Sequence, residues 1–289
     1  MTIRTFKLLL FSCLCGTLTL FAQGPDPSRS NLPAMRTPPD PKLPTLFLVG
    51  DSTVRNGRGD GANGQWGWGD LIGEYFDPSK INVVNWALGG RSSRTYITEG
   101  HWAKLLQVLK PGDFVMIQFG HNDGGALNDA TRARGSIKGT GDESQDVDNL
   151  LTHSHETVHS YGWYLRQYIS DTRAKGATPI LCSMIPRKIW KEGRIQRNKG
   201  DYAGWAAEVA QKEHVPFVDL NEIIAARYDR MGPGKVNPLF GDEHTHTTRA
   251  GAELNAECVV AGLKALKPDP LAPYFSARAE AISPAQPAP

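Results

Sequence analysis

Residues 240–251, FGDEHTHTTRAG, contain two carboxylates and two imidazoles within five positions. A histidine hydrogen-bonded to a carboxylate can act as a general base, and the same residue types can also ligate a metal ion. Asp242 and Glu243 are the candidate acids, and His244 and His246 are the candidate bases. The choice among them depends on what the fold brings beside this stretch.

Three earlier segments carry residues suited to acyl transfer. GDST contains Ser52, a hydroxyl nucleophile if a base lies within hydrogen-bonding reach. GGRSS contains Gly89 and Gly90, whose backbone amides can approach a ligand closely because glycine has no side chain. FGHNDGG contains Asn122, whose side-chain amide can donate to an oxyanion. Each segment alone is also explained by helix capping or a tight turn, but together they supply the groups that acyl transfer needs.

The elements that must position these residues form a regular alternation. Nearly continuous apolar runs, typical of strands buried on both faces, occupy 45–50, 82–88, 113–120, 178–185 and 215–220. Helix-like segments lie between or after them at 68–76, 101–109, 157–176, 201–214 and 249–266. This order predicts an α/β protein, a three-layer α/β/α sandwich around a five-stranded parallel sheet. Ligands bind such sheets beyond the carboxyl ends of the strands, where the segments above are expected.

The ends of the chain differ from this central region. Arg4 and Lys7 precede an apolar run that ends near Ala22, which predicts a signal peptide over 1–22 and an exported protein, secreted or periplasmic. Lipidation at Cys13 is a less favoured alternative. Residues 23–44 are a Pro-rich linker, 45–266 the catalytic domain, and 267–289 a loose Pro/Ala-rich tail.

Charge and cysteine content limit the possible partners. Cleavage after residue 22 removes two of 32 basic residues and none of the 30 acidic ones, so the net charge becomes zero. A neutral chain argues against electrostatic binding to nucleic acid or to a membrane. Cys182 and Cys258 lie in apolar contexts and can be either buried thiols or one disulfide; the sequence leaves this open. A monomer is expected.

The four segments GDST, GGRSS, FGHNDGG and EHTHTTRAGAE resemble, in this order, the blocks of the SGNH (GDSL-like) hydrolases. More narrowly, they resemble the rhamnogalacturonan acetylesterase group of carbohydrate esterases. The likeness runs through nearly all of 45–266 and includes NGQWGWGD, AKGATPIL and Ile185-Pro186. It implies a flavodoxin-like fold, a cofactor-free esterase without a catalytic metal, and an acetylated polysaccharide or oligosaccharide as substrate.

The resemblance also implies roles for individual residues. Ser52 matches the nucleophile and His246 the base, and the oxyanion hole matches the amides of Ser52, Gly90 and Asn122. The family has an aspartate three residues before its histidine, where this chain has Glu243. Glu243 is therefore expected to orient His246, with Asp242, one residue earlier, as the rival acid. His244 is expected to be a loop or packing residue.

Substrate-binding residues are less well marked. Arg91 and Arg94 lie beside the oxyanion glycine and are candidates to pair with a uronate carboxylate, or to form structural salt bridges instead. Trp190 is a candidate for stacking on a sugar face, with ordinary packing as the alternative. The long charged segment 125–156 is expected to shape a substrate groove. No long apolar lid is evident, which disfavours a triglyceride lipase.

Other functions stay open at this point. Another ester, such as acetylxylan or a small acyl ester, could be the substrate, or the domain could bind glycans without catalysis. A metal-dependent hydrolase would use His244 and His246 with the imidazoles of His153, His155 and His159, although this trio is more simply a polar helix start. The G-x-G-x-x-G pattern at 59–64 lies too far past the first strand for a dinucleotide site and is expected to be a mobile loop.

Overall fold

The computed structural model describes residues 35–286. Its centre is a five-stranded parallel sheet with the spatial order β2-β1-β3-β6-β9. The strands are β1 (Thr45–Gly50), β2 (Asn82–Asn85), β3 (Phe114–Gln118), β6 (Thr178–Cys182) and β9 (Phe217–Val218). The predicted three-layer sandwich is confirmed, and the order is the doubly wound one whose switch point lies between β1 and β3.

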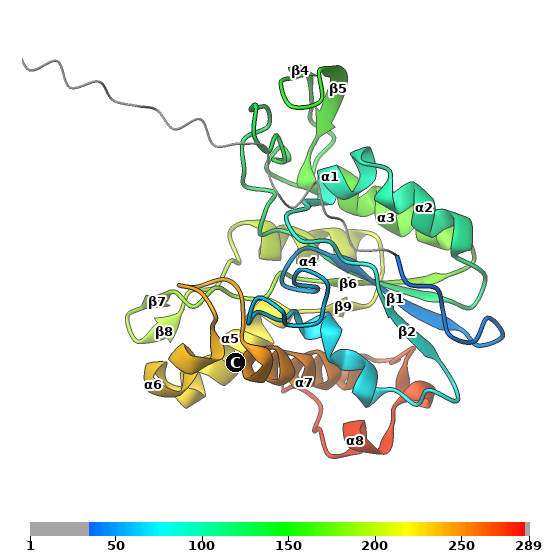
Figure 1. Ribbon diagram of the computed structural model, residues 1–289, viewed down its shortest axis with the longest axis vertical. Helices are drawn as coiled ribbons and strands as arrows, with labels where there is room; N and C mark the ends of the chain where they lie inside the picture. The colour runs from blue at the N-terminus through cyan, green and yellow to red at the C-terminus, as the bar shows by residue number, and fades with distance from the viewer. Residues whose placement is uncertain (1–34, 287–289) are drawn as a thin grey trace, which may run out of the picture.

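Helices cover both faces of the sheet (Figure 1). One face carries α1 (Ser93–Thr98), α2 (His101–Val108), α3 (Tyr161–Ala174) and α4 (Tyr202–Lys212). The other carries α5 (Leu220–Met231) and α7 (Arg249–Ala265), with the short 3₁₀ helices η2 (Trp68–Asp70) and η3 (Ile72–Tyr75). Phe47 and Val49 of β1 pack on the first side and Leu46 and Leu48 on the second, because successive strand side chains point to opposite faces. This explains why the strand is apolar throughout.

Several predicted elements were wrong in detail. The helix expected at 68–76 is instead the pair of short 3₁₀ helices η2 and η3. Directly after β1 the chain forms a turn, in which the amides of Val54 and Arg55 donate to the Asp51 carbonyl. The expected helix at 157–176 begins only at Tyr161, where the Ser160 hydroxyl accepts a hydrogen bond from the Trp163 amide and caps α3. The residues before it form β5 (Ser154–His159), which pairs with β4 (Ser144–Asn149) in a hairpin that projects from the body (Figure 1). Helix α5 was not predicted.

The smaller elements complete the described chain. They are β7 (Trp190–Lys191), β8 (Arg194–Ile195), α6 (Pro233–Val236), η4 (Asn237–Leu239), η5 (Ala272–Tyr274) and α8 (Ala277–Glu280). No helix within residues 35–286 is both long and apolar enough to cross a membrane. Cys182 and Cys258 are both free thiols in the interior, and burial raises the pKa of Cys258 to about 12. The predicted signal peptide at 1–22 lies outside the described residues.

The expectation of a loose tail after residue 266 is contradicted up to residue 286. Leu271 is completely buried, and the Phe275 ring lies 5.3 Å from that of Phe76. Arg278 pairs with Glu253 at 2.5 Å on α7. Apolar contacts every few residues, rather than the prolines counted in the sequence, therefore decide the structure of this segment.

Leu271→Ala should lower the free energy of unfolding by about 2–5 kcal/mol, because it empties a fully buried site. Urea denaturation would measure the change. Leu150→Ala, the same substitution at a side chain that is 55% exposed, is the matched control and should have little effect. Equal, small changes in both variants would mean that the C-terminal segment does not contribute to stability.

Candidate active site

Folding brings Ser52 and His246, which are 194 positions apart, into contact. The Ser52 Oγ lies 2.8 Å from His246 Nε2, and His246 Nδ1 lies 2.6 Å from Asp242 Oδ2. All three side chains are partly exposed to solvent. The arrangement is a hydroxyl, an imidazole and a carboxylate in hydrogen-bonded series, which allows the imidazole to take a proton from the hydroxyl.

The turn after β1 holds Ser52. Backbone amides of Val54 and Arg55 both donate to the Asp51 carbonyl, so the chain reverses directly beyond the strand. The Asp51 carboxylate accepts hydrogen bonds of 2.8 Å from the amide and the hydroxyl of Thr53. The Thr53 hydroxyl in turn accepts a hydrogen bond from Gln118 Nε2 on β3, which ties the turn to the neighbouring strand. Ser52 is therefore carried on a turn that is held by hydrogen bonds within the turn and by one from the neighbouring strand β3.

A second turn holds His246. One oxygen of Asp242, Oδ1, accepts hydrogen bonds from the backbone amides of His244, Thr245 and His246 at 2.7–3.1 Å. Partial burial would raise the pKa of Asp242, but the amides of His246 and Thr245 and the His246 side chain outweigh it and hold the pKa below its ordinary value. Helix α7 follows at once, capped by the Thr248 hydroxyl. Asp242 thus shapes the loop with one oxygen and the imidazole with the other.

The prediction that Glu243 orients His246 is contradicted by this geometry. The Glu243 side chain is 91% exposed, and its nearest partner is His244 Nδ1 at 3.7 Å. The turn is centred on the shorter Asp242 side chain, whose reach matches the three converging amides. The carboxylate at the next position consequently points away from His246, and the rival acid occupies the place four residues before the histidine.

The predicted oxyanion donors belong to the Ser52 turn, to the glycine loop that approaches it, and to Asn122, which is bonded to that loop. A Cβ added at Gly89 would sit 3.6 Å from the Ser52 Cβ, and Gly90 has a left-handed φ of +77° that favours glycine. Within residues 35–286, the amides of Ser52 and Gly90 donate to no protein acceptor. Asn122 Nδ2 donates to the Arg91 carbonyl at 2.8 Å, which fixes the amide and leaves its second N–H without a protein acceptor in the same range.

Arg91 and Arg94, the predicted uronate-binding residues, are instead buried and paired with carboxylates. Arg91 Nε donates to Glu99 at 2.9 Å. Arg94 forms a two-point contact with both oxygens of Glu156, at 2.6 Å each. These guanidiniums hold α1 and the β4–β5 hairpin in place, so the alternative of structural salt bridges is the one the structure supports.

The roles of Trp190 and of the segment 125–156 in sugar binding stay predictions. Trp190 in β7 packs against the core on the α5–α7 side, and its buried Nε1 has no hydrogen-bond partner within the described residues. The 125–156 segment contains most of the projecting β4–β5 hairpin. His155 belongs to this hairpin, not to a helix start, and lies 3.2 Å from Asp148 at the surface.

Two residues near the site, His121 and Asp123, have buried side chains and were not singled out from the sequence. His121 contacts Asp51 Oδ2 through Nδ1 at 3.2 Å and the Ile185 carbonyl through Nε2 at 3.0 Å, so it links the loops after β1, β3 and β6. Asp123 accepts hydrogen bonds from the Ser93 amide and hydroxyl at the start of α1, and burial raises the pKa of Asp123 to about 6. His121 directly precedes Asn122 and Asp123 directly follows it, and this adjacency was the only signal in the sequence that pointed to them.

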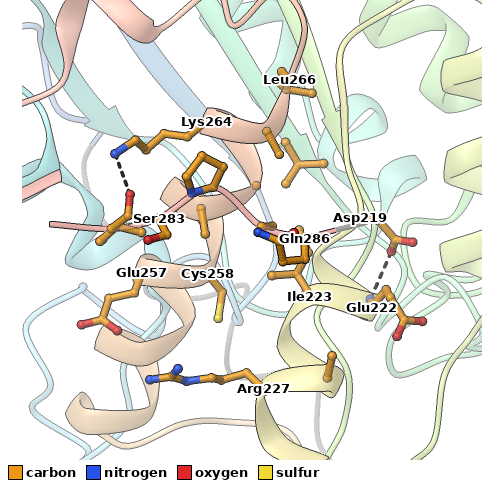
Figure 2. Close-up of a pocket in the computed structure, with 18 of the residues that line it drawn as sticks. Asp219, Glu222, Ile223, Arg227, Glu257, Cys258, Lys264, Leu266, Ser283 and Gln286 are labelled. Atoms are coloured by element: carbon orange, nitrogen blue, oxygen red, sulfur yellow. Dashed lines mark hydrogen bonds between the residues drawn. The ribbon is translucent and has the colours of Figure 1, made fainter. Parts of the chain in front are cut away.

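Possible metal sites and cavities elsewhere in the described chain were compared with this site. Among residues 35–286, no group of three or more His, Cys, Asp or Glu side chains is arranged to hold a metal ion. A cavity of about 1220 Å³ lies between α5, α7 and the C-terminal segment, and Cys258 and Lys264 are among its lining residues (Figure 2). Neither Ser52 nor His246 lines it. The Ser52–His246–Asp242 series is therefore separate from that cavity.

A serine, histidine and aspartate linked in this way at the carboxyl edge of a parallel sheet are the groups of the serine hydrolases, which react through an acyl-enzyme. Residues 48–254 match the GDSL-like Lipase/Acylhydrolase family, and the chain belongs to it. The resemblance found in the sequence is thereby confirmed.

Individual relatives narrow this assignment. The chain is 33% identical over 213 residues to a rhamnogalacturonan acetylesterase of Emericella nidulans, covering 74% of this chain and 82% of the relative. It is 34% identical over 226 residues to the probable rhamnogalacturonan acetylesterase YesY of Bacillus subtilis, covering 76% and 93%. The crystal structure of YxiM from Bacillus subtilis superposes with a TM-score of 0.62 at 27% identity, covering 77% of this chain and 56% of that one.

Proposed function

We propose that this protein is a serine esterase that removes O-acetyl groups from an acetylated carbohydrate, with acetylated rhamnogalacturonan as the substrate. The observation that carries the proposal is the 2.8 Å contact between the Ser52 hydroxyl and His246, with Asp242 behind the imidazole. The names of the relatives from Emericella nidulans and Bacillus subtilis support the choice of substrate.

The reaction follows from the positions of these atoms. His246 Nε2 takes the proton of Ser52 as Oγ attacks the carbonyl carbon of the acetyl ester. The tetrahedral intermediate collapses, His246 returns the proton to the sugar oxygen, and the acetyl group stays on Ser52. Water then attacks this acyl-enzyme with the same base, releasing acetate and restoring the hydroxyl. Asp242 keeps the proton of neutral His246 on Nδ1 and stabilises the imidazolium that forms.

The negative charge on the carbonyl oxygen needs donors that are in place before the reaction. The amides of Ser52 and Gly90 and the second N–H of Asn122 fill this role in the proposal. Their support is that none of these three N–H groups has a protein acceptor within residues 35–286, although each lies beside Ser52 or the loop that touches it.

Asn122→Ala should lower kcat by about a hundred- to a thousandfold, the usual effect of removing one oxyanion donor. KM should change less, because the donor acts mainly on the transition state. Initial rates on an activated acetyl ester would measure both constants. Asn128→Ala, which removes an amide that only bonds to the hairpin backbone, is the control. Equal rates for the two variants would contradict the assignment.

The site of action is proposed from the sequence, since Arg4, Lys7 and the apolar run to Ala22 lie outside the described residues. An exported enzyme would meet polysaccharide outside the cytoplasm. All of the proposed catalytic groups lie in one chain, so the proposed reaction needs no residue from a second subunit; that the protein acts as a monomer stays a prediction.

The test of the proposed function is acetate release from acetylated rhamnogalacturonan oligosaccharides, acetylated xylan fragments and a small acyl ester. The proposed substrate should give the highest kcat/KM. A higher value for acetylated xylan or for the small ester would overturn the substrate assignment and leave the esterase assignment intact. Glycan binding without acetate release from any of them would overturn the esterase assignment.

A further inference from the structure

We infer that Arg187 binds the carboxylate of a uronate residue in the substrate and so makes this site selective for acidic acetylated glycans. The inference deepens the proposed function and depends on it for the reaction, but it rests on a separate group of contacts. The observation behind it is that no carboxylate among residues 35–286 pairs with the Arg187 guanidinium, which lies at the active edge of the sheet.

Arg187 lies in the loop that follows β6, beside the catalytic groups. Its Nη2 donates to the His121 carbonyl at 3.2 Å, and its Nη1 contacts His244 Nε2 at 3.0 Å. His121 immediately precedes Asn122, and His244 lies two residues before His246. The Lys188 amide also donates to the His244 carbonyl at 2.9 Å, which joins the two loops. The guanidinium is therefore fixed between the segment of the oxyanion donor and the segment of the base.

The charge of Arg187 is not balanced by its protein partners. A guanidinium only donates hydrogen bonds, so His244 accepts through a neutral imidazole whose proton is on Nδ1. The other partner is a carbonyl oxygen, and no carboxylate among residues 35–286 lies within 4.0 Å of the guanidinium. Arg91 and Arg94, in contrast, each bind a glutamate. The positive charge at this edge is thus available to a ligand.

Two further cations lie along the 240–249 segment, which carries His244, and add positive charge to it. Lys188 Nζ lies 5.1 Å from the Phe240 ring, and Arg249 lies 5.3 Å from the Trp66 ring, so both cations border the 240–249 segment. Of the two acids there, Asp242 is occupied by His246 and three amides. Glu243 is 91% exposed and contacts His244 on the nitrogen opposite to Arg187.

The chemistry of the site selects a carboxylate on a sugar ring. Each terminal nitrogen of the guanidinium carries two N–H groups and uses one on the protein, which leaves donors for a planar, two-point contact with a carboxylate. A uronate unit carries its carboxylate and its acetylated hydroxyl on one rigid ring. Binding the carboxylate to Arg187 would therefore orient the ester toward Ser52, which is how remote binding energy accelerates a reaction.

The experiment compares acetylated rhamnogalacturonan oligosaccharides with the same oligosaccharides after methyl esterification of their carboxylates. Arg187→Gln should lower the ratio of kcat/KM for the acidic over the methyl-esterified substrate by about ten- to a hundredfold, the worth of hydrogen bonds between charged groups. Arg187→Lys should retain part of the ratio, because it keeps the charge but loses the two-point geometry. Raised salt should weaken the preference of the wild type.

Arg173→Gln is the matched control. The Arg173 guanidinium on α3 also binds only carbonyl oxygens, those of Glu213 and His214, and its loss changes the net charge equally. This variant should keep the wild-type ratio. An unchanged ratio in Arg187→Gln, or equal losses on both substrates, would overturn the inference.

A binding measurement separates failure of the inference from failure of the proposed function. Calorimetry with deacetylated rhamnogalacturonan oligosaccharide requires no turnover. Wild type should bind this oligosaccharide more tightly than Arg187→Gln does. The two proteins should bind its methyl-esterified form with equal affinity. If the wild type releases no acetate but this difference persists, the esterase proposal fails and Arg187 still binds a uronate. If acetate is released but the difference is absent, only the Arg187 inference fails.

Discussion

Replacing Asp242 with asparagine should lower kcat for ester hydrolysis by about ten-thousandfold, with a much smaller change in KM. Asparagine can keep its Oδ1 where three backbone amides donate to it, so the 242–246 turn should persist. Its amide nitrogen would then face His246 Nδ1 and favour the tautomer with the proton on Nε2. That tautomer cannot accept a proton from Ser52, and no negative charge remains to stabilise the imidazolium.

Glu243→Gln is the control for this change, since it makes the same replacement of a carboxylate by an amide one residue later. The Glu243 side chain is exposed and does not touch His246, so kcat should stay within about twofold of the wild type, as for most surface substitutions. Initial rates on an activated acetyl ester, with thermal unfolding to establish that both variants are folded, would measure the contrast. A crippled Glu243→Gln beside an active Asp242→Asn would restore the glutamate as the acid.

The contrast between these two acids shows where reasoning from the sequence reached its limit. Ser52, Gly90 and Asn122 follow strand ends, and strand ends were readable from apolar runs. Parallel strands bring such loops to one edge whatever the loop details are. Which of two adjacent carboxylates faces an imidazole depends instead on backbone hydrogen bonds within a five-residue turn. No periodicity in the sequence encodes those bonds, and the family spacing pointed to the wrong residue.

The prediction that Arg91 and Arg94 bind a uronate was wrong because it depended on carboxylates elsewhere in the chain. Their pairing partners are Glu99, past the end of α1, and Glu156, on a strand where a helix was expected nearby. Once the hairpin is missed, its glutamate is missing from the charge balance and Arg94 appears free to bind a substrate. Arg187 was not predicted from the sequence. It is distinguished by having no carboxylate partner among residues 35–286, and only the three-dimensional structure shows which partners an arginine has.

The fold was more accessible than the site. A buried parallel strand is apolar on both faces, so each of the five runs is distinct in the sequence. Helix α5 was missed because its cap, Asp219, and its first residue, Leu220, lie within the apolar run 215–220 that was assigned to a strand. The C-terminal segment was misjudged because its prolines are distributed as in a disordered tail, while its few anchors, such as Leu271 and Phe275, are too widely spaced to form a pattern.

Replacing Ser52 with alanine should lower kcat by about a millionfold, leaving only the contribution of substrate binding and the oxyanion donors. The Ser52 hydroxyl is the one group from which His246 Nε2 can take a proton at hydrogen-bonding distance among residues 35–286. Because the hydroxyl and the imidazole act as a unit, His246→Ala should cost about as much, and the double variant little more than either single one. Sensitive detection of acetate release would measure these residual rates.

Covalent labelling makes the same prediction independent of the substrate. An organophosphorus probe should add once to the wild type, and peptide mass analysis should place the adduct on Ser52, since only a serine activated by a base reacts readily. Ser170→Ala, which removes an exposed hydroxyl on α3, should label and turn over like the wild type. Because Asp242 orients the imidazole that activates Ser52, an Asp242→Asn variant should also label slowly while remaining folded. Normal labelling of Ser52→Ala would mean that a different nucleophile performs the reaction.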